Sequence, residues 1–224
     1  MKLVFLPGLD GTGLLFDRLI DALPKDLSIE IFSLDEIAGD TYYEQANELA
    51  KRFENENIII VAESYSGRIA YELCGILGNK IKGIVFLASF ISSPSLISKL
   101  AGYLPLLFIK PLVITKFIVN LIGFNGSGRK AEIDSIFHSL QKCNKTKIKS
   151  RLRNISKLTK PDVVYKQPVT YIKPHNDYLV SGGAVRVLQD IFVNLNVVTV
   201  QGGHFIAQSN PEECSKIVCS SITT

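Results

Sequence analysis

The stretch that decides the fold is Ile58–Gly67, which reads IIIVAESYSG. Its four β-branched residues and the alanine that follows them indicate a buried strand. From Ser66 onward the apolar residues recur at helical spacing, so a helix is expected to begin where the strand ends. Ser64 is therefore predicted to lie on a sharp turn between the two. A serine at such a turn is most often a helix cap, so a catalytic role needs support from other residues.

Length and composition indicate a globular protein. The chain has 224 residues, of which 46% are hydrophobic and 21% charged, which suits one domain with a substantial core. The apolar stretch Leu3–Leu6 is too short for a signal peptide, so we expect a cytoplasmic protein. The net charge of +4 requires no nucleic-acid partner. The cysteines lack the spacing of metal ligands or of a disulfide framework, which predicts free thiols, no metal site and no cofactor; they are Cys74, Cys143, Cys214 and Cys219.

Strand and helix patterns alternate along most of the chain. Strands are predicted at Leu3–Leu6, Ser28–Ser33, Asn57–Ala62, Ile81–Ala88, Val169–Ile172 and Asn196–Val200. Helices are predicted at Leu14–Leu23, Tyr42–Phe53, Ser66–Leu77, Gly182–Phe192 and Pro211–Ser220. This alternation predicts an α/β fold with an open, mostly parallel sheet of about six strands and helices on both faces. Functional sites in such folds lie at the carboxyl ends of the strands.

The alternation is interrupted between residues 92 and 160, which we call the cap segment. Its length exceeds that of an ordinary loop and no strand pattern occurs in it, so a helical insertion is predicted. The first half is apolar, but charged residues and prolines interrupt it before any run reaches the about 18 residues of a membrane span. The second half is basic, with Glu132 and Asp134 set against ten cations: Arg129, Lys130, Lys142, Lys145, Lys147, Lys149, Arg151, Arg153, Lys157 and Lys160.

A catalytic serine needs a base, and the chain offers three histidines. His138 lies in the basic half of the cap segment, where a surface position is expected. His175 follows a strand and is interpreted as a loop residue near the site. His204 follows the last strand and two glycines, which allow the backbone to present the ring at the sheet edge. His204 is therefore the candidate base.

Asp177 is the candidate acid that orients His204. It follows a late strand, so Ser64, Asp177 and His204 are all expected at one edge of the sheet. Their chain order of nucleophile, acid and base is that of the α/β-hydrolase arrangement. Taken alone, Asp177 would be a turn residue, and Asp35 or Glu36 after an earlier strand remain alternatives.

The segment Leu6–Gly13 (LPGLDGTG) is predicted to complete the site. It follows the first strand, but it lacks the ending of a phosphate-binding P-loop and the GxGxxG spacing of a dinucleotide site. A serine hydrolase needs two backbone N–H donors for the developing oxyanion, which Leu9 and Tyr65 would supply. Gly8 allows close approach to the substrate, and Asp10 or Thr12 is expected to brace the loop.

Through LPGLDG, AESYSG, the Asp177 turn and GGH at 202–204, the sequence resembles the α/β-hydrolase superfamily over essentially its whole length. The resemblance implies a core of residues 1–91 and 161–224 and a cap of residues 92–160. It implies a catalytic triad of Ser64, Asp177 and His204. The family's usual glycines two residues before and after the nucleophile are replaced by Ala62 and Ser66, which are small enough to leave the turn intact.

The implied activity is that of a serine esterase or thioesterase that forms an acyl-enzyme. The superfamily also contains acyltransferases and non-catalytic binding proteins, which the elbow sequence does not separate. Apolar cap residues either line a pocket for a medium or long acyl chain or only pack the cap against the core. They are Leu96, Leu100, Leu104, Leu106, Leu107, Phe108, Ile114, Phe117 and Ile118.

The basic half of the cap segment has two interpretations. It is either a solvated face or a docking site for an anionic partner, with Lys145, Lys149 and Arg153 as the candidates. An acyl carrier protein, an acyl-coenzyme A or an anionic membrane surface would fit. The layout is similar to that of the esterases that cleave the methyl ester of a pimeloyl carrier protein. A nucleic-acid role is not expected, because the segment lacks a recognised motif and has little aromatic interleaving.

Overall fold

The computed structural model describes residues 1–94 and 110–222, and its centre is a six-stranded sheet. The strand order is β2-β1-β3-β4-β5-β6, and every neighbouring pair is parallel. The strands are β1 (Lys2–Leu6), β2 (Ile29–Ile31), β3 (Ile58–Glu63), β4 (Ile81–Leu87), β5 (Val169–Pro174) and β6 (Leu195–Val200). This confirms the predicted α/β architecture and the strand count.

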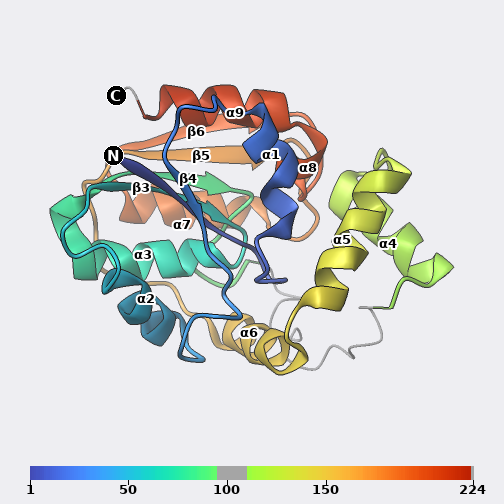
Figure 1. The fold of residues 1–224 in the computed structure, drawn as a ribbon, viewed down its shortest axis with the longest axis horizontal. Coiled ribbons are helices and arrows are strands. Elements are labelled where there is room, and N and C mark those ends of the chain that lie inside the picture. Colours follow the sequence, from blue (N-terminus) through green and yellow to red (C-terminus); the bar gives the residue numbers. More distant parts are fainter. Residues whose placement is uncertain (95–109, 223–224) are drawn as a thin grey trace.

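Helices cover both faces of the sheet (Figure 1). The α1 helix (Asp17–Ala22) and α9 (Pro211–Ser220) pack against one face, where Leu3 and Phe5 point. The other face carries α2 (Tyr42–Ala50), α3 (Ser66–Leu77) and α7 (Gly182–Ile191), where Val4 and Leu6 point. Because successive side chains of a strand point to opposite faces, a strand buried on both sides must be mainly apolar, as β1 is from Leu3 to Leu6 and β3 is from Ile58 to Ala62.

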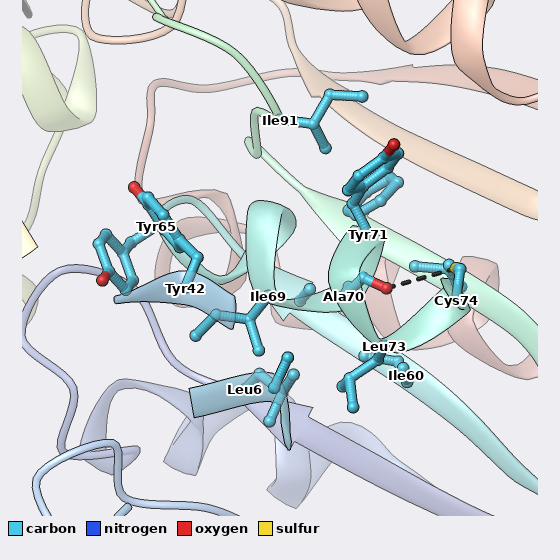
Figure 2. Packing of buried hydrophobic residues seen from close by; sticks show 14 of the residues in the cluster. Leu6, Tyr42, Ile60, Tyr65, Ile69, Ala70, Tyr71, Leu73, Cys74 and Ile91 are labelled. Atoms are coloured by element: carbon cyan, nitrogen blue, oxygen red, sulfur yellow. Dashed lines mark hydrogen bonds between the residues drawn. The ribbon is translucent and has the colours of Figure 1, made fainter. Parts of the chain in front are cut away.

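The α3 helix continues directly from the central strand β3, and its packing fixes the turn between them. Figure 2 shows Ile69 and Leu73 on the side of α3 that faces Leu6 of β1 and Ile60 of β3. All four side chains are completely buried. The start of α3 is therefore held against the two central strands, at their carboxyl ends.

Three predicted helices differ from the structure at their ends, and for α7 the difference is one residue, because it ends at Ile191 instead of Phe192. The predicted helix at 14–23 consists of a 3₁₀ turn, η1 (Leu14–Phe16), followed by α1, and α2 ends at Ala50 instead of Phe53. Two further elements, η2 (Gly78–Lys80) and α8 (Ile206–Ser209), are single turns, which are too short to produce a periodic signal in sequence.

The described part of the cap segment is helical, as the sequence predicts. It contains α4 (Val113–Phe124), α5 (Lys130–Lys142) and α6 (Lys145–Lys157). In Figure 1, α4 and α5 lie beyond the end of the sheet toward which the strands point. Residues 95–109, which include Leu96, Leu100, Leu104, Leu106, Leu107 and Phe108 of the predicted acyl pocket, lie outside the described residues.

Three further properties concern the whole of the described chain. No helix within residues 1–94 and 110–222 is long and apolar enough to cross a membrane. In the same ranges, no group of three or more histidine, cysteine, aspartate and glutamate side chains is arranged to hold a metal ion. The four cysteines carry free thiols.

Candidate active site

Ser64 lies on the turn between β3 and α3 with a φ angle of +47°, a conformation that non-glycine residues seldom adopt. Backbone contacts hold it there. The Ser64 N–H donates to the Leu87 carbonyl (3.0 Å), and its own carbonyl accepts from Ser89 Oγ (2.7 Å) and the Gly67 N–H (3.2 Å). Because these bonds fix both sides of the residue, the turn keeps its strained conformation and presents the hydroxyl above the sheet edge.

The turn leaves no room for a side chain at Gly67, the third residue after Ser64. A Cβ atom added to Gly67 would lie 2.2 Å from Ser89 Oγ and 2.6 Å from the Phe90 carbonyl oxygen. Ser66 uses its hydroxyl to donate to the Pro7 carbonyl, which ties the elbow to the loop after β1. The elbow thus forms with Ala62 and Ser66 in the places where the superfamily usually has glycine.

A chain of hydrogen bonds joins Ser64, His204 and Asp177. His204 Nε2 lies 3.0 Å from Ser64 Oγ, and His204 Nδ1 lies 2.9 Å from Asp177 Oδ2. The three residues follow β3, β5 and β6, so the parallel sheet brings Ser64 against His204, which lies 140 residues away in sequence. His204 is 5% exposed, whereas His138 and His175 are exposed.

Asp177 is held as an ionised acceptor by its own loop. Its Oδ1 atom accepts from the N–H groups of Leu179 (2.8 Å) and Val180 (2.9 Å), while Oδ2 faces His204. Burial opposes ionisation, but the charge and hydrogen bond of His204 and the two N–H groups outweigh it, so the pKa of Asp177 is lowered. The alternative acids do not contact His204: Asp35 pairs with Arg151, and Glu36 is exposed.

The pKa of His204 is raised above its ordinary value. Burial alone would lower it, but the negative charge of Asp177, the hydrogen bond to Asp177 and the charge of Glu63 favour the protonated ring more strongly. A ring with this preference accepts a proton readily. The arrangement can therefore take the hydroxyl proton of Ser64 and hold the resulting positive charge against Asp177.

The loop after β1 carries Leu9, the predicted oxyanion donor, and Tyr65 directly follows Ser64. Among the described residues, neither the Leu9 N–H nor the Tyr65 N–H donates a hydrogen bond, so both are available to a bound group. Asp10 braces the loop as expected. Its Oδ2 atom accepts from the Thr12 N–H (3.0 Å) and the Thr12 hydroxyl (2.7 Å).

Glu63 is a site residue that the sequence did not single out. It precedes Ser64, is 3% exposed, and its Oε2 atom has no hydrogen-bond partner among the described residues. Burial, together with the negative charge of Asp10, raises the pKa of Glu63 to about 7, against the opposing effect of His204. Its position as the last residue of an otherwise apolar strand was the available signal.

Three polar residues of the cap segment also reach the site region: Ser139 of α5, and Arg151 and Asn154 of α6. The prediction that Arg151 belongs to the basic surface is wrong, because its side chain is 1% exposed and paired with Asp35. Its helical spacing from Ile148 and Ile155, which are also buried, was the signal that places it on the inner face of α6. Lys145, Lys149 and Arg153 are exposed.

The fold of this chain matches solved structures of other proteins, although its sequence matches no known family. No protein-family description and no curated protein matches the sequence. Solved structures do match over nearly the full chain. A hydrolase from Oleispira antarctica has a TM-score of 0.78 and 12% identity, with 100% of this chain and 91% of that chain covered.

Two further solved structures have the same fold as this chain. A lipase-esterase related protein from Clostridium acetobutylicum has a TM-score of 0.75 and 15% identity, covering 98% of this chain and 93% of that one. A thermophilic esterase from Thermogutta terrifontis has a TM-score of 0.79 and 10% identity, covering 100% and 89%. At these identities the similarity establishes the fold that the three proteins share with this chain.

Proposed function

We propose that this chain, which has the α/β-hydrolase fold, is a serine hydrolase that cleaves a carboxylic ester or thioester through an acyl-enzyme. The observation that carries the proposal is the continuous hydrogen-bond chain from Ser64 through His204 to Asp177. Folds of this kind host many chemistries, so the side chains and not the fold support the activity.

In the first half-reaction His204 Nε2 takes the proton of Ser64 as Oγ forms a bond to the substrate carbonyl carbon. The carbonyl π electrons move to oxygen, and the oxyanion accepts hydrogen bonds from the Leu9 and Tyr65 N–H groups. Asp177 holds the imidazole in the required tautomer and stabilises its charged form. When the tetrahedral intermediate collapses, the bond to the alcohol or thiol breaks, and His204 returns its proton to the leaving group.

In the second half-reaction water repeats these steps on the acyl-enzyme. His204 deprotonates water, the hydroxide adds to the acyl carbon, and Ser64 leaves with the proton that His204 returns. The free acid is released and the serine is restored. All groups that move protons in this cycle belong to the chain itself.

The proposed substrate carries a medium or long acyl chain beneath a cap formed by residues 92–160. The support is the apolar character of α4, in which Ile114 and Phe117 are 60% and 61% exposed, with Ile118 beside them. An apolar helix surface at the carboxyl ends of the strands is suited to contact with an acyl chain.

We also propose that Lys145, Lys149 and Arg153 dock an anionic carrier of the acyl group, such as an acyl carrier protein, or an anionic membrane surface. The three residues are spaced four apart along α6, which places them on one side of the helix, and all are exposed. Clustered cations of this kind steer a negatively charged partner to the site.

The activity is tested with a series of p-nitrophenyl esters from acetate to palmitate. Ser64→Ala and His204→Ala are expected to lower kcat by about 10⁶-fold, and Asp177→Asn by about 10⁴-fold. His138→Ala, which changes an exposed histidine, is the control and should keep wild-type turnover. The chain-length optimum reports the depth of the acyl site, and product analysis with added alcohols separates hydrolysis from acyl transfer. Wild-type turnover by Ser64→Ala would contradict the proposal.

A further inference from the structure

The inner face of α6 contacts the two residues that are proposed to stabilise the oxyanion. Arg151 and Asn154 are three residues apart, so they point to the same side of the helix. Arg151 reaches the loop that carries Leu9, and Asn154 reaches Tyr65. No other described helix of the cap segment bonds to both.

Arg151 holds the loop after β1 through its backbone. Its Nη1 atom donates to the carbonyls of Leu9 (3.2 Å) and Asp10 (3.0 Å), and Nη2 donates to the carboxylate of Asp35. The guanidinium also packs against Gly11, where a Cβ atom would lie only 2.3 Å from Arg151 Cζ. A planar group with several donors in fixed geometry can hold two carbonyls and a carboxylate at once.

The other carboxylate oxygen of Asp35 fastens the start of the same helix. Its Oδ2 atom accepts from the Asn144 N–H (2.6 Å), and Asn144 caps α6 by accepting from the N–H groups of Thr146 (2.9 Å) and Lys147 (3.2 Å). Asp35 therefore ties both the helix end and the Arg151 side chain to the core. The hydrogen bonds of Asp35 and Arg151 therefore position both α6 and the loop after β1.

Asn154 holds Tyr65 from the other side. Its Nδ2 atom donates to the Tyr65 hydroxyl oxygen (3.0 Å) and to the Asp40 carbonyl. The Tyr65 ring is completely buried and stacks on Tyr42, with ring centroids 4.6 Å apart (Figure 2). The ring is thus fixed at its face and at its tip, which restricts the backbone that carries the Tyr65 N–H.

The α5 helix adds a third contact to the same loop. Ser139 Oγ donates to Asp10 Oδ2 (2.7 Å) and lies 2.8 Å from the Thr12 hydroxyl. The loop after β1 is therefore bonded on one side to α5 and on the other to α6. Without these helices the Asp10 brace and the Leu9 carbonyl would lose their partners in the cap segment.

We propose that α6 is a clamp that sets the oxyanion hole, with Arg151 and Asn154 as positioning residues for the Leu9 and Tyr65 N–H groups. This inference rests on the proposed serine hydrolase activity. Neither side chain is required to touch the substrate. Their effect is to hold two donors at the separation that the tetrahedral intermediate requires, and a misplacement of about 1 Å can cost about 10²-fold in rate.

The first test is kinetic and uses Arg151→Ala, Arg151→Lys and Asn154→Ala with a soluble p-nitrophenyl ester. We expect kcat to fall by about 10 to 100-fold in Arg151→Ala, with KM within about twofold of wild type, because donor placement matters mainly in the transition state. The midpoint of the pH profile should stay unchanged, since His204 and Asp177 are untouched. Arg151→Lys should recover part of the loss, and added guanidinium ions should raise the rate of Arg151→Ala but not that of wild type.

The matched control is Lys157→Ala, which removes an exposed cation from the same helix. It should keep wild-type kinetics. If Arg151→Ala does not fold, the kinetic test is made with Arg151→Lys and Asn154→Ala. Tyr65→Phe removes the hydrogen bond between Asn154 and Tyr65 from the tyrosine side, as Asn154→Ala does from the asparagine side. Losses in Asn154→Ala and Tyr65→Phe should then not add in the double variant.

A second readout separates the clamp from the activity. Amide hydrogen exchange of residues 8–13 should be faster in Arg151→Ala than in wild type and in Lys157→Ala, whether or not the protein turns over an ester. Unchanged exchange with unchanged kcat would overturn the clamp. Faster exchange in a protein whose wild type neither turns over esters nor reacts at Ser64 would support the clamp as a structural device and reject the hydrolase.

Discussion

At the scale of single residues, the environment of His204 determines how activity depends on pH. The base acts in its neutral form, and its pKa is raised above its ordinary value, about 6.5, chiefly because Asp177 outweighs the effect of burial. We therefore expect kcat/KM to fall on acidification with a midpoint above about pH 6.5. Asp177, whose pKa is lowered, stays ionised throughout and adds no second acidic limb. A profile that stays flat down to about pH 5 would rule out His204 as the base.

Glu63 is expected to make the folded state less stable at alkaline pH. Its pKa is about 7 in the fold against an ordinary value of 4.5, so the folded protein keeps a proton that the unfolded chain releases. The stabilising contribution is complete below about pH 4.5 and is lost as pH rises through about 7. Replacing the acid by an amide removes this loss.

Urea unfolding of wild type and Glu63→Gln at about pH 5 and pH 8 measures the effect. Between these two values wild type should lose on the order of 2 to 3 kcal/mol more than the variant. His204 also contributes stability that is lost as pH rises through its raised folded pKa, and this contribution is smaller in Glu63→Gln, which lacks the Glu63 charge that helps raise the pKa of His204. An equal change in the two proteins would show that Glu63 is ionised in the fold at neutral pH.

The site residues that can be found from sequence are those that directly follow a recognisable strand. Ser64 and His204 each follow a recognisable strand, and their contact follows from the parallel sheet. Their catalytic roles, with that of Asp177, stay predictions. Arg151 was misassigned because its charge suggested a surface position. Only the tertiary structure shows that Asp35 and two carbonyls compensate the cost of burying that charge.

At the scale of elements, the elbow between β3 and α3 depends on Gly67. A Cβ atom at this position would lie 2.2 Å from Ser89 Oγ, the atom that holds the Ser64 carbonyl. Gly67→Ala is therefore expected to destabilise the protein by roughly 1 to 3 kcal/mol and to lower kcat, because the elbow must shift. The control is Gly182→Ala at the start of α7, where the added atom meets nothing within 4 Å.

Thermal unfolding and ester turnover of both variants provide the measurement. Gly182→Ala should match or slightly exceed wild-type stability, since alanine favours a helix more than glycine does. If Gly67→Ala kept both the stability and the turnover of wild type, the crowding around Ser89 would not control the elbow.

Elements were predicted well where a periodic pattern coincides with a clear boundary. The bounds of α3 and α9 agree with the sequence, the second because Pro211 occupies the first turn, where its missing N–H costs nothing. The predicted strand at 28–33 shortens to β2 (Ile29–Ile31), the three residues that pair with Leu3–Phe5 of β1. Single turns such as α8 contain too few residues for a pattern.

At the scale of the whole molecule, the described part of the cap segment, residues 92–94 and 110–160, has an inner face that bonds to the core and an outer face that carries exposed charge. Hydrogen bonds from Ser139 and Arg151 join residues 129 to 142 positions apart to the loop after β1. Contacts over such separations leave no local trace in the sequence. The proposed division at residues 92 and 160 therefore marks where the cap segment begins and ends in the sequence. It does not separate two parts that lack contact with each other.

The exposed charges of the outer face predict a preference for an acyl group bound to a carrier protein over a small soluble ester. Reversing the charges of Lys145, Lys149 and Arg153 to glutamate should weaken activity on an acyl group attached to an acyl carrier protein, because the attraction between the proteins is lost. Hydrolysis of a small soluble ester should be unchanged, since the three residues are exposed and Arg151 is left in place. Added salt should reduce the wild-type preference for the carrier. Equal losses on both substrates would contradict docking through this face.

The central claim is that Ser64 is a nucleophile activated by His204, and covalent labelling tests it most directly. Wild type, Ser64→Ala and His204→Ala are treated with a fluorophosphonate, and the intact masses and the labelled peptide are determined. We expect one adduct on wild type, located at Ser64, none on Ser64→Ala, and labelling slowed by orders of magnitude in His204→Ala. An unlabelled wild type, or an adduct that persists in Ser64→Ala, would contradict the account.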